Sequence, residues 1–369
     1  MRHGITRIDK IEDYRLFESI IDTRTPAEFA EDHIPGAINC PVLDDQQRIE
    51  VGTLYKQHSP FAAKKIGAAY VAENIAHHLR HTFQDCPQNW RPLIVCWRGG
   101  QRSGAMTLIL RRVGWDAQQL EGGYKYYRKL VVDTLTEIPA RLSFRILCGA
   151  TGSGKSRLLQ ALARQGEQVL DLEELACHKG SVLGVLPDSA QPSQKMFETK
   201  LLVALAELDP QRPVYAEAES RKIGNIHLPT ALLEAMRRSP CVNIEATLEA
   251  RVDFLLRDYS YFLEAPAWLN TRLDDLRHLQ SRETIERWHE FTRTADWRRL
   301  VGELLELHYD PLYRRSQNSN FSGLDKPQTF LASDLTPDAL AVLAQQIASH
   351  APPPGNMVKT QPFQAPPKA

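Results

Sequence analysis

The segment LIVCWRGGQRS, residues 93–103, joins a short apolar run to a cysteine and a loop with two glycines. The apolar run predicts a buried strand that delivers Cys96 to its end. Residues 103–113 have helical spacing, with Ser103 as the predicted N-cap and Gly114 as the stop. A strand, a glycine loop and a helix in this order indicate an α/β fold.

The position of Cys96 favours a reactive thiolate. A thiol at a strand-to-helix turn faces backbone N–H groups and the positive end of the helix dipole. Arg98 and Arg102 add positive charge, which also stabilises the thiolate, the nucleophilic form of cysteine. The alternative is a structural cysteine, because free cysteines are often buried. Arginines in a glycine loop fit that alternative poorly, so we predict Cys96, Arg98 and Arg102 as catalytic residues.

Three stretches near the start of the chain resemble the rhodanese family. The cysteine loop is similar to the family's active-site loop, IDTRTPAEFAEDHIPGAIN at 21–39 resembles its early signature, and LEGGY at 120–124 resembles its closing one. The resemblance implies a rhodanese-like domain over residues 1–138, with a parallel sheet covered by helices on both faces. It also implies that Cys96 carries sulfur or selenium as a persulfide-type adduct. Residues 50–75, polar and then helical, are an insertion that a plain rhodanese does not need.

A second glycine-rich loop, GATGSGKS at 149–156, fits the phosphate-binding pattern G-x-x-x-x-G-K-[ST]. A strand-like run at 144–148 precedes it and an amphipathic helix to Gly166 follows, which is the context that the pattern requires. Its glycines let successive backbone N–H groups bind phosphate oxygens, while Lys155 adds charge and Ser156 can ligate Mg²⁺. The predicted phosphate-binding residues are Gly149, Gly152, Ser153, Gly154, Lys155 and Ser156.

Enzymes that hydrolyse nucleotides in such a loop usually hold Mg²⁺ with an acidic residue at the end of a neighbouring strand. Asp171, Glu217 and Glu219 are the candidates, but none of them ends a long apolar strand. The sequence therefore predicts a di- or triphosphate ligand strongly and hydrolysis only weakly. It leaves open the use of ATP, of GTP and of Mg²⁺ as a cofactor.

A rhodanese-like domain followed by a phosphate-loop domain is an unusual order. In this order the chain resembles the tRNA 2-selenouridine synthases over about residues 8–330. Beyond the two loops, the similar stretches are GTLYKQ at 52–57, GGYK at 122–125, DLE at 171–173, HKGS at 178–181, EAESRKIG at 217–224 and HYDPLY at 308–313. Lys179 stands where Arg is expected, and Ala218 where Asp is common, which weakens a metal role for position 218. The resemblance implies a further site in the second domain, formed by Asp171, His178, Lys179, Ser181, Glu217, Glu219 and Arg221.

That resemblance implies an activity and its co-substrates. The family replaces sulfur by selenium in the wobble 2-thiouridine of tRNA with selenophosphate, and it is associated with geranylation of that sulfur from geranyl diphosphate. An alkylated sulfur departs more easily, as a thiol, and the phosphate loop would stabilise the departing pyrophosphate. Cys96 would then either carry the selenium or assist thiol release. The tRNA anticodon loop and a selenophosphate-supplying enzyme are the implied partners.

The second domain is expected over residues 139–350, as an α/β phosphate-loop domain with a helical extension at about 247–325. The extension mixes arginines, which pair with phosphates, and aromatic residues, which stack on bases: Arg251, Arg257, Arg272, Arg277, Arg282, Arg287, Arg293, Arg298, Arg299, Tyr259, Tyr261, Trp288 and Trp297. Either the extension contacts tRNA or it is a solvated face, because Asp and Glu are equally frequent there. Residues 308–310 are either a lid or a packing corner, and the proline-rich tail 351–369 is predicted to be disordered.

Composition narrows the choice of partners and compartment. The formal net charge of zero removes any overall attraction to nucleic acid, so tRNA contact would need local patches. Six scattered cysteines without a CxxC pair favour neither disulfides nor zinc. No signal peptide or stretch of about 20 apolar residues is evident, so we expect a soluble, cytoplasmic protein without membrane association.

Two other functions remain open from the sequence. One is a rhodanese-type sulfurtransferase fused to a small-molecule kinase that uses ATP or GTP and has no RNA substrate. The other is a non-enzymatic phosphate sensor with an inert rhodanese-like module. The transferase that acts on tRNA is favoured over both, because both domains and the insertion fit it together.

Overall fold

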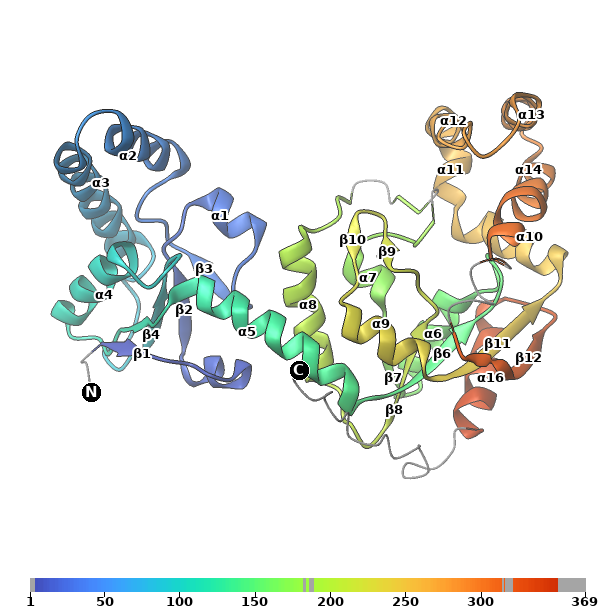
Figure 1. Ribbon diagram of the computed structural model, residues 1–369, viewed down its shortest axis with the longest axis horizontal. Coiled ribbons are helices and arrows are strands. Elements are labelled where there is room, and N and C mark those ends of the chain that lie inside the picture. Colours follow the sequence, from blue (N-terminus) through green and yellow to red (C-terminus); the bar gives the residue numbers. More distant parts are fainter. Residues whose placement is uncertain (1–3, 182–183, 186–188, 314, 316–320, 351–369) are drawn as a thin grey trace, which may run out of the picture. The chain divides into compact units, whose positions relative to one another are not determined.

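The computed structural model describes residues 4–181, 184–185, 189–313, 315 and 321–350. The chain divides into two compact units, residues 1–136 with 192–203 and residues 137–191 with 204–369 (Figure 1). The first division lies close to the boundary expected at 138. Residues 192–203, expected in the second domain, belong to the first unit instead.

Polar contacts explain why residues 192–203 belong to the first unit. This stretch includes most of helix α8 (Gln194–Ala206). Lys195 forms an ion pair of 2.7 Å with Glu31, and Arg128 forms an ion pair with Glu198. A lysine and a glutamate on α8 therefore reach partners far away in sequence, which a local pattern does not reveal.

The first unit contains a five-stranded sheet in the order β1-β5-β4-β2-β3, in which every pair is parallel. Its strands are β1 (Ile5–Thr6), β2 (Ser19–Asp22), β3 (Ala37–Asn39), β4 (Pro92–Val95) and β5 (Gln118–Leu120). Its other helices are the 3₁₀ helix η1 (Ile11–Leu16), α1 (Pro26–Glu31), α2 (Asp45–Gln57), α3 (Pro60–His81), α4 (Gln101–Val113) and α5 (Gly123–Glu137). Buried Ile21, Ile94, Met106 and Leu110 join the sheet to α4 in one apolar cluster, so the β4–α4 loop has a rigid base.

The expected insertion at 50–75 falls within the helical pair α2 and α3. Asp44 caps α2 by accepting a hydrogen bond from the Gln47 amide, and Ser59 caps α3. The two helices approach closely at Gly67, where an added Cβ would lie 3.3 Å from a methyl carbon of Val51. The insertion is thus a capped helical hairpin.

The second unit has its own five-stranded parallel sheet, in the order β12-β11-β6-β8-β7. The strands are β6 (Ser143–Cys148), β7 (Gln168–Leu170), β8 (Pro213–Glu217), β11 (Pro240–Ala246) and β12 (Gly323–Ala332), and a small antiparallel pair is formed by β9 (Lys222–Ile223) and β10 (Ile226–His227). Because parallel strands point the same way, β6, β7 and β8 end at one edge of the sheet. The phosphate loop and the candidate acidic residues follow these ends.

The remaining helices of the second unit include the expected helical extension. They are η2 (Ile138–Arg141), α6 (Lys155–Arg164), α7 (Leu172–Ala176), α9 (Thr230–Arg237), α10 (Leu248–Asp258), α11 (Ser260–Glu264), α12 (Pro266–Asp274), α13 (Arg282–Arg293), α14 (Trp297–Glu303), the π-helical turn η3 (Leu304–Tyr309) and α16 (Pro337–Ser349). Figure 1 shows α11 to α14 grouped together beside the second sheet. They share an apolar cluster around the fully buried Trp288. Trp288 therefore cannot stack on an RNA base, because it forms the core of the extension.

Two further expectations concern membrane-spanning helices and the C-terminal tail. In the described part of the chain, no helix combines the length and the apolar character that crossing a membrane requires. The tail 351–369, predicted to be disordered, lies outside the described residues.

Candidate active site

The sulfur of Cys96 lies in a cradle of hydrogen-bond donors directly after β4. Its Sγ atom accepts hydrogen bonds from the Gly100 amide at 3.2 Å and from the Ser103 hydroxyl at 3.0 Å. Only 3% of Cys96 is exposed. Donors fixed around a sulfur stabilise its anionic form, so the loop geometry is suited to a thiolate or a selenide.

The prediction of Ser103 as the N-cap of the helix is wrong. Helix α4 begins one turn earlier with Gly100 as its N-cap, and Ser103 is the third helical residue. Its buried hydroxyl is directed to Cys96 instead. The stop at Gly114 is confirmed, since this glycine caps α4 in the left-handed conformation with φ of 116°.

The closing stretch 120–124 packs against the cysteine loop. Gly123 has φ of 58°, and an added Cβ there would lie 2.2 Å from the Cys96 carbonyl oxygen. The Tyr124 amide donates a hydrogen bond of 2.8 Å to the same oxygen. Only glycine permits this approach, so the two similar stretches form one structural unit.

Arg102 is held by a partner that the sequence prediction did not include. It donates to both carboxylate oxygens of Glu28 in α1, at 2.6 and 3.2 Å. Burial alone would raise the pKa of the Glu28 carboxyl, but the hydrogen bond and charge of Arg102 outweigh burial and hold that pKa below its ordinary value. Arg98 is exposed on the loop. Of the two arginines, Arg102 is thus fixed as a link between α1 and α4.

Of the six predicted phosphate-binding residues, Gly149, Gly152, Ser153 and Gly154 lie in the turn between β6 and α6, and Lys155 and Ser156 begin α6. Gly149, Gly152 and Gly154 all have positive φ, and an added Cβ at Gly149 would lie 2.7 Å from the Ile244 carbonyl oxygen. The Lys155 ammonium donates to the Gly149 carbonyl at 2.8 Å, so it lies folded over the loop. This is the backbone conformation that a phosphate-binding loop needs.

Arg251 and Asp310 support the phosphate loop from the helical extension. Arg251 is buried, donates to the Thr151 carbonyl at 2.8 Å, and forms a bidentate pair with Asp310 at 2.6 and 3.1 Å. The Tyr313 hydroxyl accepts a 2.6 Å hydrogen bond from the Gly149 amide. The HYDPLY stretch therefore includes packing contacts with the loop, which favours the packing corner over a lid.

Three carboxylates meet beside Ser156 at the carboxyl edge of the sheet. Glu217 ends β8, Glu219 follows it, and Glu173 lies in α7; one oxygen of each lies within 4.8 Å of the others. Burial, foremost, raises the pKa of all three carboxyls. Asp171 caps α7 by accepting from the Glu174 amide at 2.9 Å. Asp171, one of the acids expected near the loop, is thus a helix cap. Glu173 takes part in the carboxylate cluster, although it was not among the expected site residues.

The other residues expected in the second-domain site differ in burial and in their partners. Lys179 forms an ion pair of 2.6 Å with Asp258, and its ammonium lies 4.0 Å from the ring centre of Tyr259. His178 is buried, which lowers its pKa. Arg221 is exposed, whereas Ser181 borders the apolar pocket described next. His178 and Ser181 line one cleft, and Gly180 of the same stretch lies against the carboxylates of Glu173 and Glu219.

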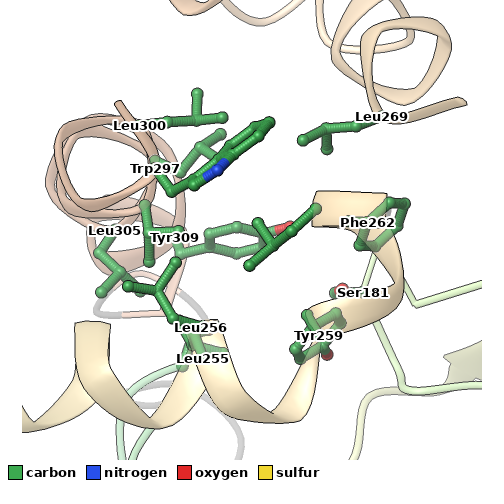
Figure 2. Close-up of a pocket in the computed structure, with 14 residues that line it drawn as sticks. Ser181, Leu255, Leu256, Tyr259, Phe262, Leu269, Trp297, Leu300, Leu305 and Tyr309 are labelled. Carbon is green, nitrogen blue, oxygen red and sulfur yellow. The ribbon is translucent and has the colours of Figure 1, made fainter. Parts of the chain in front are cut away.

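An apolar pocket with a cavity volume of about 70 Å³, partly open to solvent, adjoins the phosphate loop. Figure 2 shows aromatic and leucine side chains converging on it from several helices of the extension. Its lining residues are Thr151, Ser181, Leu255, Leu256, Tyr259, Phe262, Leu263, Leu269, Trp297, Leu300, Val301, Leu304, Leu305 and Tyr309. Thr151 belongs to the loop itself, so one ligand could reach both. The sequence indicated the aromatic residues but not this cavity.

Most arginines of the extension are paired with neighbouring acids. Five of those predicted to contact tRNA pair with an acid three or four residues away: Arg272, Arg277, Arg282, Arg293 and Arg299. Arg287 pairs with Glu303 in α14, and Arg298 pairs with Asp253 in α10. Arg251 is buried against the loop, as described above. These contacts favour a solvated face with local charge compensation over a uniformly basic tRNA surface.

Comparison with known proteins identifies both units. A family model described as "tRNA 2-selenouridine synthase AAA domain" matches residues 142–271, and one described as "Rhodanese-like domain" matches residues 8–130. A protein of Alcanivorax borkumensis called tRNA 2-selenouridine synthase is 33% identical over 323 residues, which cover 80% of this chain and 88% of that protein. The chain belongs to the tRNA 2-selenouridine synthase family. The predicted family and two-domain α/β fold are thereby confirmed.

Other members of the tRNA 2-selenouridine synthase family are similarly related. The synthase of Hahella chejuensis is 34% identical over 345 residues, covering 82% of this chain and 87% of that protein. The synthase of Nitrosomonas europaea is 36% identical over 244 residues, covering 65% of this chain and 63% of that protein. The similarity thus extends across both units.

Proposed function

We propose that this chain is a transferase that replaces sulfur by selenium in the wobble 2-thiouridine of tRNA, with selenophosphate as the selenium donor. Geranylation of that sulfur from geranyl diphosphate would precede the exchange. Membership of the tRNA 2-selenouridine synthase family supports selenium modification of tRNA. The observation that carries the geranylation step is the apolar pocket beside the phosphate loop.

Geranyl diphosphate has the two chemical parts that this pair of sites would bind. Its diphosphate suits the N–H groups and Lys155 of the loop. Its ten-carbon chain suits the leucine and aromatic lining. Each CH₂ group removed from water contributes about 0.8 kcal/mol of favourable binding free energy. Apart from its tyrosines, the described lining of the pocket has only two side chains with a hydroxyl, Thr151 and Ser181. A ribose would therefore find few hydrogen-bond partners there. The pocket therefore favours a prenyl diphosphate over the substrate of a small-molecule kinase.

The geranylation step would be a substitution at the first carbon of the geranyl chain. The tRNA sulfur forms a bond to that carbon, the carbon–oxygen bond to diphosphate breaks, and the base releases its N3 proton. Charge develops on the departing diphosphate. Loop N–H groups and the Lys155 ammonium would stabilise that charge where it forms.

The selenation step would use the cradle around Cys96. A selenium nucleophile attacks C2 of the base, the C2–S bond breaks, and geranyl thiol leaves with a proton. If selenophosphate attacks directly, water then cleaves the Se–P bond and phosphate is released. The donors from Gly100 and Ser103 would stabilise a Cys96 thiolate that assists thiol release. A covalent selenium adduct of Cys96 would in addition need a two-electron oxidant, because the selenium of selenophosphate is already at the selenide level.

Mass analysis of nucleosides tests this proposal. Purified protein is incubated with 2-thiouridine tRNA and geranyl diphosphate, and then with selenophosphate. We expect S-geranyl-2-thiouridine first and 2-selenouridine second. Unaltered 2-thiouridine with folded protein would contradict the proposal, and phosphorylation of a small molecule by ATP or GTP without tRNA would favour the kinase alternative.

A further inference from the structure

The helical hairpin of α2 and α3 has no role in the reaction proposed above. Figure 1 shows the two helices side by side, and α2, described throughout, contains no buried residue. In α3, Ile75 is buried in the core of the first unit, and only Ala63 and Gly67 are buried before it. Helices are normally stabilised by a buried face. Residues 51–72, called the arm below, instead leave most of their surface exposed.

The arm begins at the edge of the sheet that carries Cys96. The last residues of β3 and β4 both pair with the last residue of β2, so the three parallel strands end at one edge. Asn74 of α3 donates a hydrogen bond of 2.8 Å to Gln47, at the start of α2 and close to this edge. From Asn74 back to its first residue, Pro60, α3 is about 21 Å long. A large ligand that reaches Cys96 can therefore also contact the arm.

The arm carries positive charge that no neighbouring acid in the sequence compensates. Residues 51–72 contain no aspartate or glutamate, whereas Lys56, Lys64 and Lys65 are exposed. Among the lysines that the structure describes, ion pairs are formed by Lys179 and Lys195 and not by these three. Most arginines of the helical extension, in contrast, are paired with acids. The arm is thus better suited to a polyanion than the extension is.

Two aromatic side chains accompany these lysines. Phe61 is 76% exposed at the start of α3, and Tyr55 is 56% exposed near the end of α2. Both lie close to the turn that joins the helices, where Ser59 caps α3. Exposed aromatic rings next to unpaired cations are typical of surfaces that bind RNA, because the rings stack on unpaired bases while the cations bind phosphates.

We propose that the arm binds tRNA, with Lys56, Lys64 and Lys65 on phosphates and Phe61 stacked on an unpaired base. This inference rests on the proposed function, because it takes tRNA as the ligand brought to Cys96. It assigns to the first unit a tRNA contact that the sequence led us to expect in the helical extension.

Binding of 2-thiouridine tRNA to the full chain, measured by fluorescence anisotropy without selenophosphate or geranyl diphosphate, tests the arm. The triple variant with Lys56→Ala, Lys64→Ala and Lys65→Ala should bind tRNA about tenfold more weakly or worse. It should also lower the slope of log Kd against log salt concentration by about two to three, because fewer counterions are released. Phe61→Ala should weaken binding about tenfold and leave that slope unchanged, because stacking involves no phosphate.

A second triple variant is the matched control. Lys10→Ala, Lys200→Ala and Lys326→Ala remove the same charge from exposed lysines outside the arm, so tRNA affinity and salt slope should stay as in the wild type. The melting temperatures of all variants should equal that of the wild type, because only exposed side chains are shortened.

The outcomes separate the arm from the proposed function. Equal tRNA affinity in the wild type and both arm variants would overturn the inference and leave the proposed function standing. Absence of tRNA binding by the folded wild type would overturn both. A changed oligomeric state of the arm variants in light scattering, with unchanged tRNA affinity, would also overturn the inference and assign the arm to contacts between copies of the chain.

Discussion

At the scale of single residues, the immediate partners of the Cys96 sulfur are an amide and a hydroxyl at the start of α4. The Gly100 amide is fixed by the backbone, whereas the Ser103 hydroxyl can be removed by substitution. Arg102, expected to act on the sulfur, is committed to Glu28. The structure therefore shifts attention from the arginines to Ser103.

Ser103→Ala should slow formation of 2-selenouridine about tenfold. The variant removes one hydrogen bond to a sulfur or selenium anion, which contributes about 1.5 kcal/mol or more. The measurement is the rate of selenouridine formation by nucleoside mass analysis. Ser103→Thr keeps the hydroxyl and should recover part of the rate. Equal rates for wild type and Ser103→Ala would show that the hydroxyl has no part in the step.

At the scale of elements, the Glu28–Arg102 pair joins α1 to α4 and makes that link dependent on pH. Because the pKa of folded Glu28 lies below its ordinary value, the stabilisation is complete above about pH 4.5 and is lost as the pH falls through the lowered value. The melting temperature of the full chain should therefore fall as the pH is lowered below about 4.5. The melting temperature of the Glu28→Gln variant should fall less as the pH is lowered. If the melting temperatures of both proteins depended on pH in the same way, the proposed link between α1 and α4 would be contradicted.

The helices of the extension form the apolar pocket, so a bulky residue on one of them should block it. Val301 is half-buried on α14 and lines the cavity. Val301→Trp should weaken geranyl diphosphate binding at least tenfold, because several CH₂ groups lose their apolar environment. Inorganic diphosphate should bind as in the wild type when both are measured by calorimetry. An equal loss of affinity for both ligands would indicate a damaged phosphate loop. Unchanged affinity for geranyl diphosphate would show that the pocket does not bind the geranyl chain.

At the scale of the whole molecule, the two compact units should carry separate half-reactions. Cys96→Ser, in the first unit, should still convert 2-thiouridine to its S-geranyl form but should not form 2-selenouridine. Lys155→Ala, in the second, should lose geranylation yet still selenate tRNA supplied already geranylated. Nucleoside mass analysis reads both products. Loss of both steps in either folded variant would contradict this division.

Both loops could be predicted from the sequence, because each depends on local chemistry. Glycines with positive φ, an adjoining apolar strand and a following helix suffice to specify the turns at Cys96 and Lys155. The same local reasoning placed the N-cap at Ser103. It failed there because serine suits both a cap and a hydrogen bond to a neighbouring sulfur, and only the position of Cys96 distinguishes them.

The sequence by itself determined the family, the two α/β units and the two loops, because these depend on patterns that are local along the chain. Only the tertiary structure paired Glu28 with Arg102, since 74 positions separate them. It also gathered Glu173 with Glu217 and Glu219, because parallel strands end at one edge of the sheet. The apolar pocket likewise exists only once distant helices pack together, as burial depends on contacts that are remote in sequence.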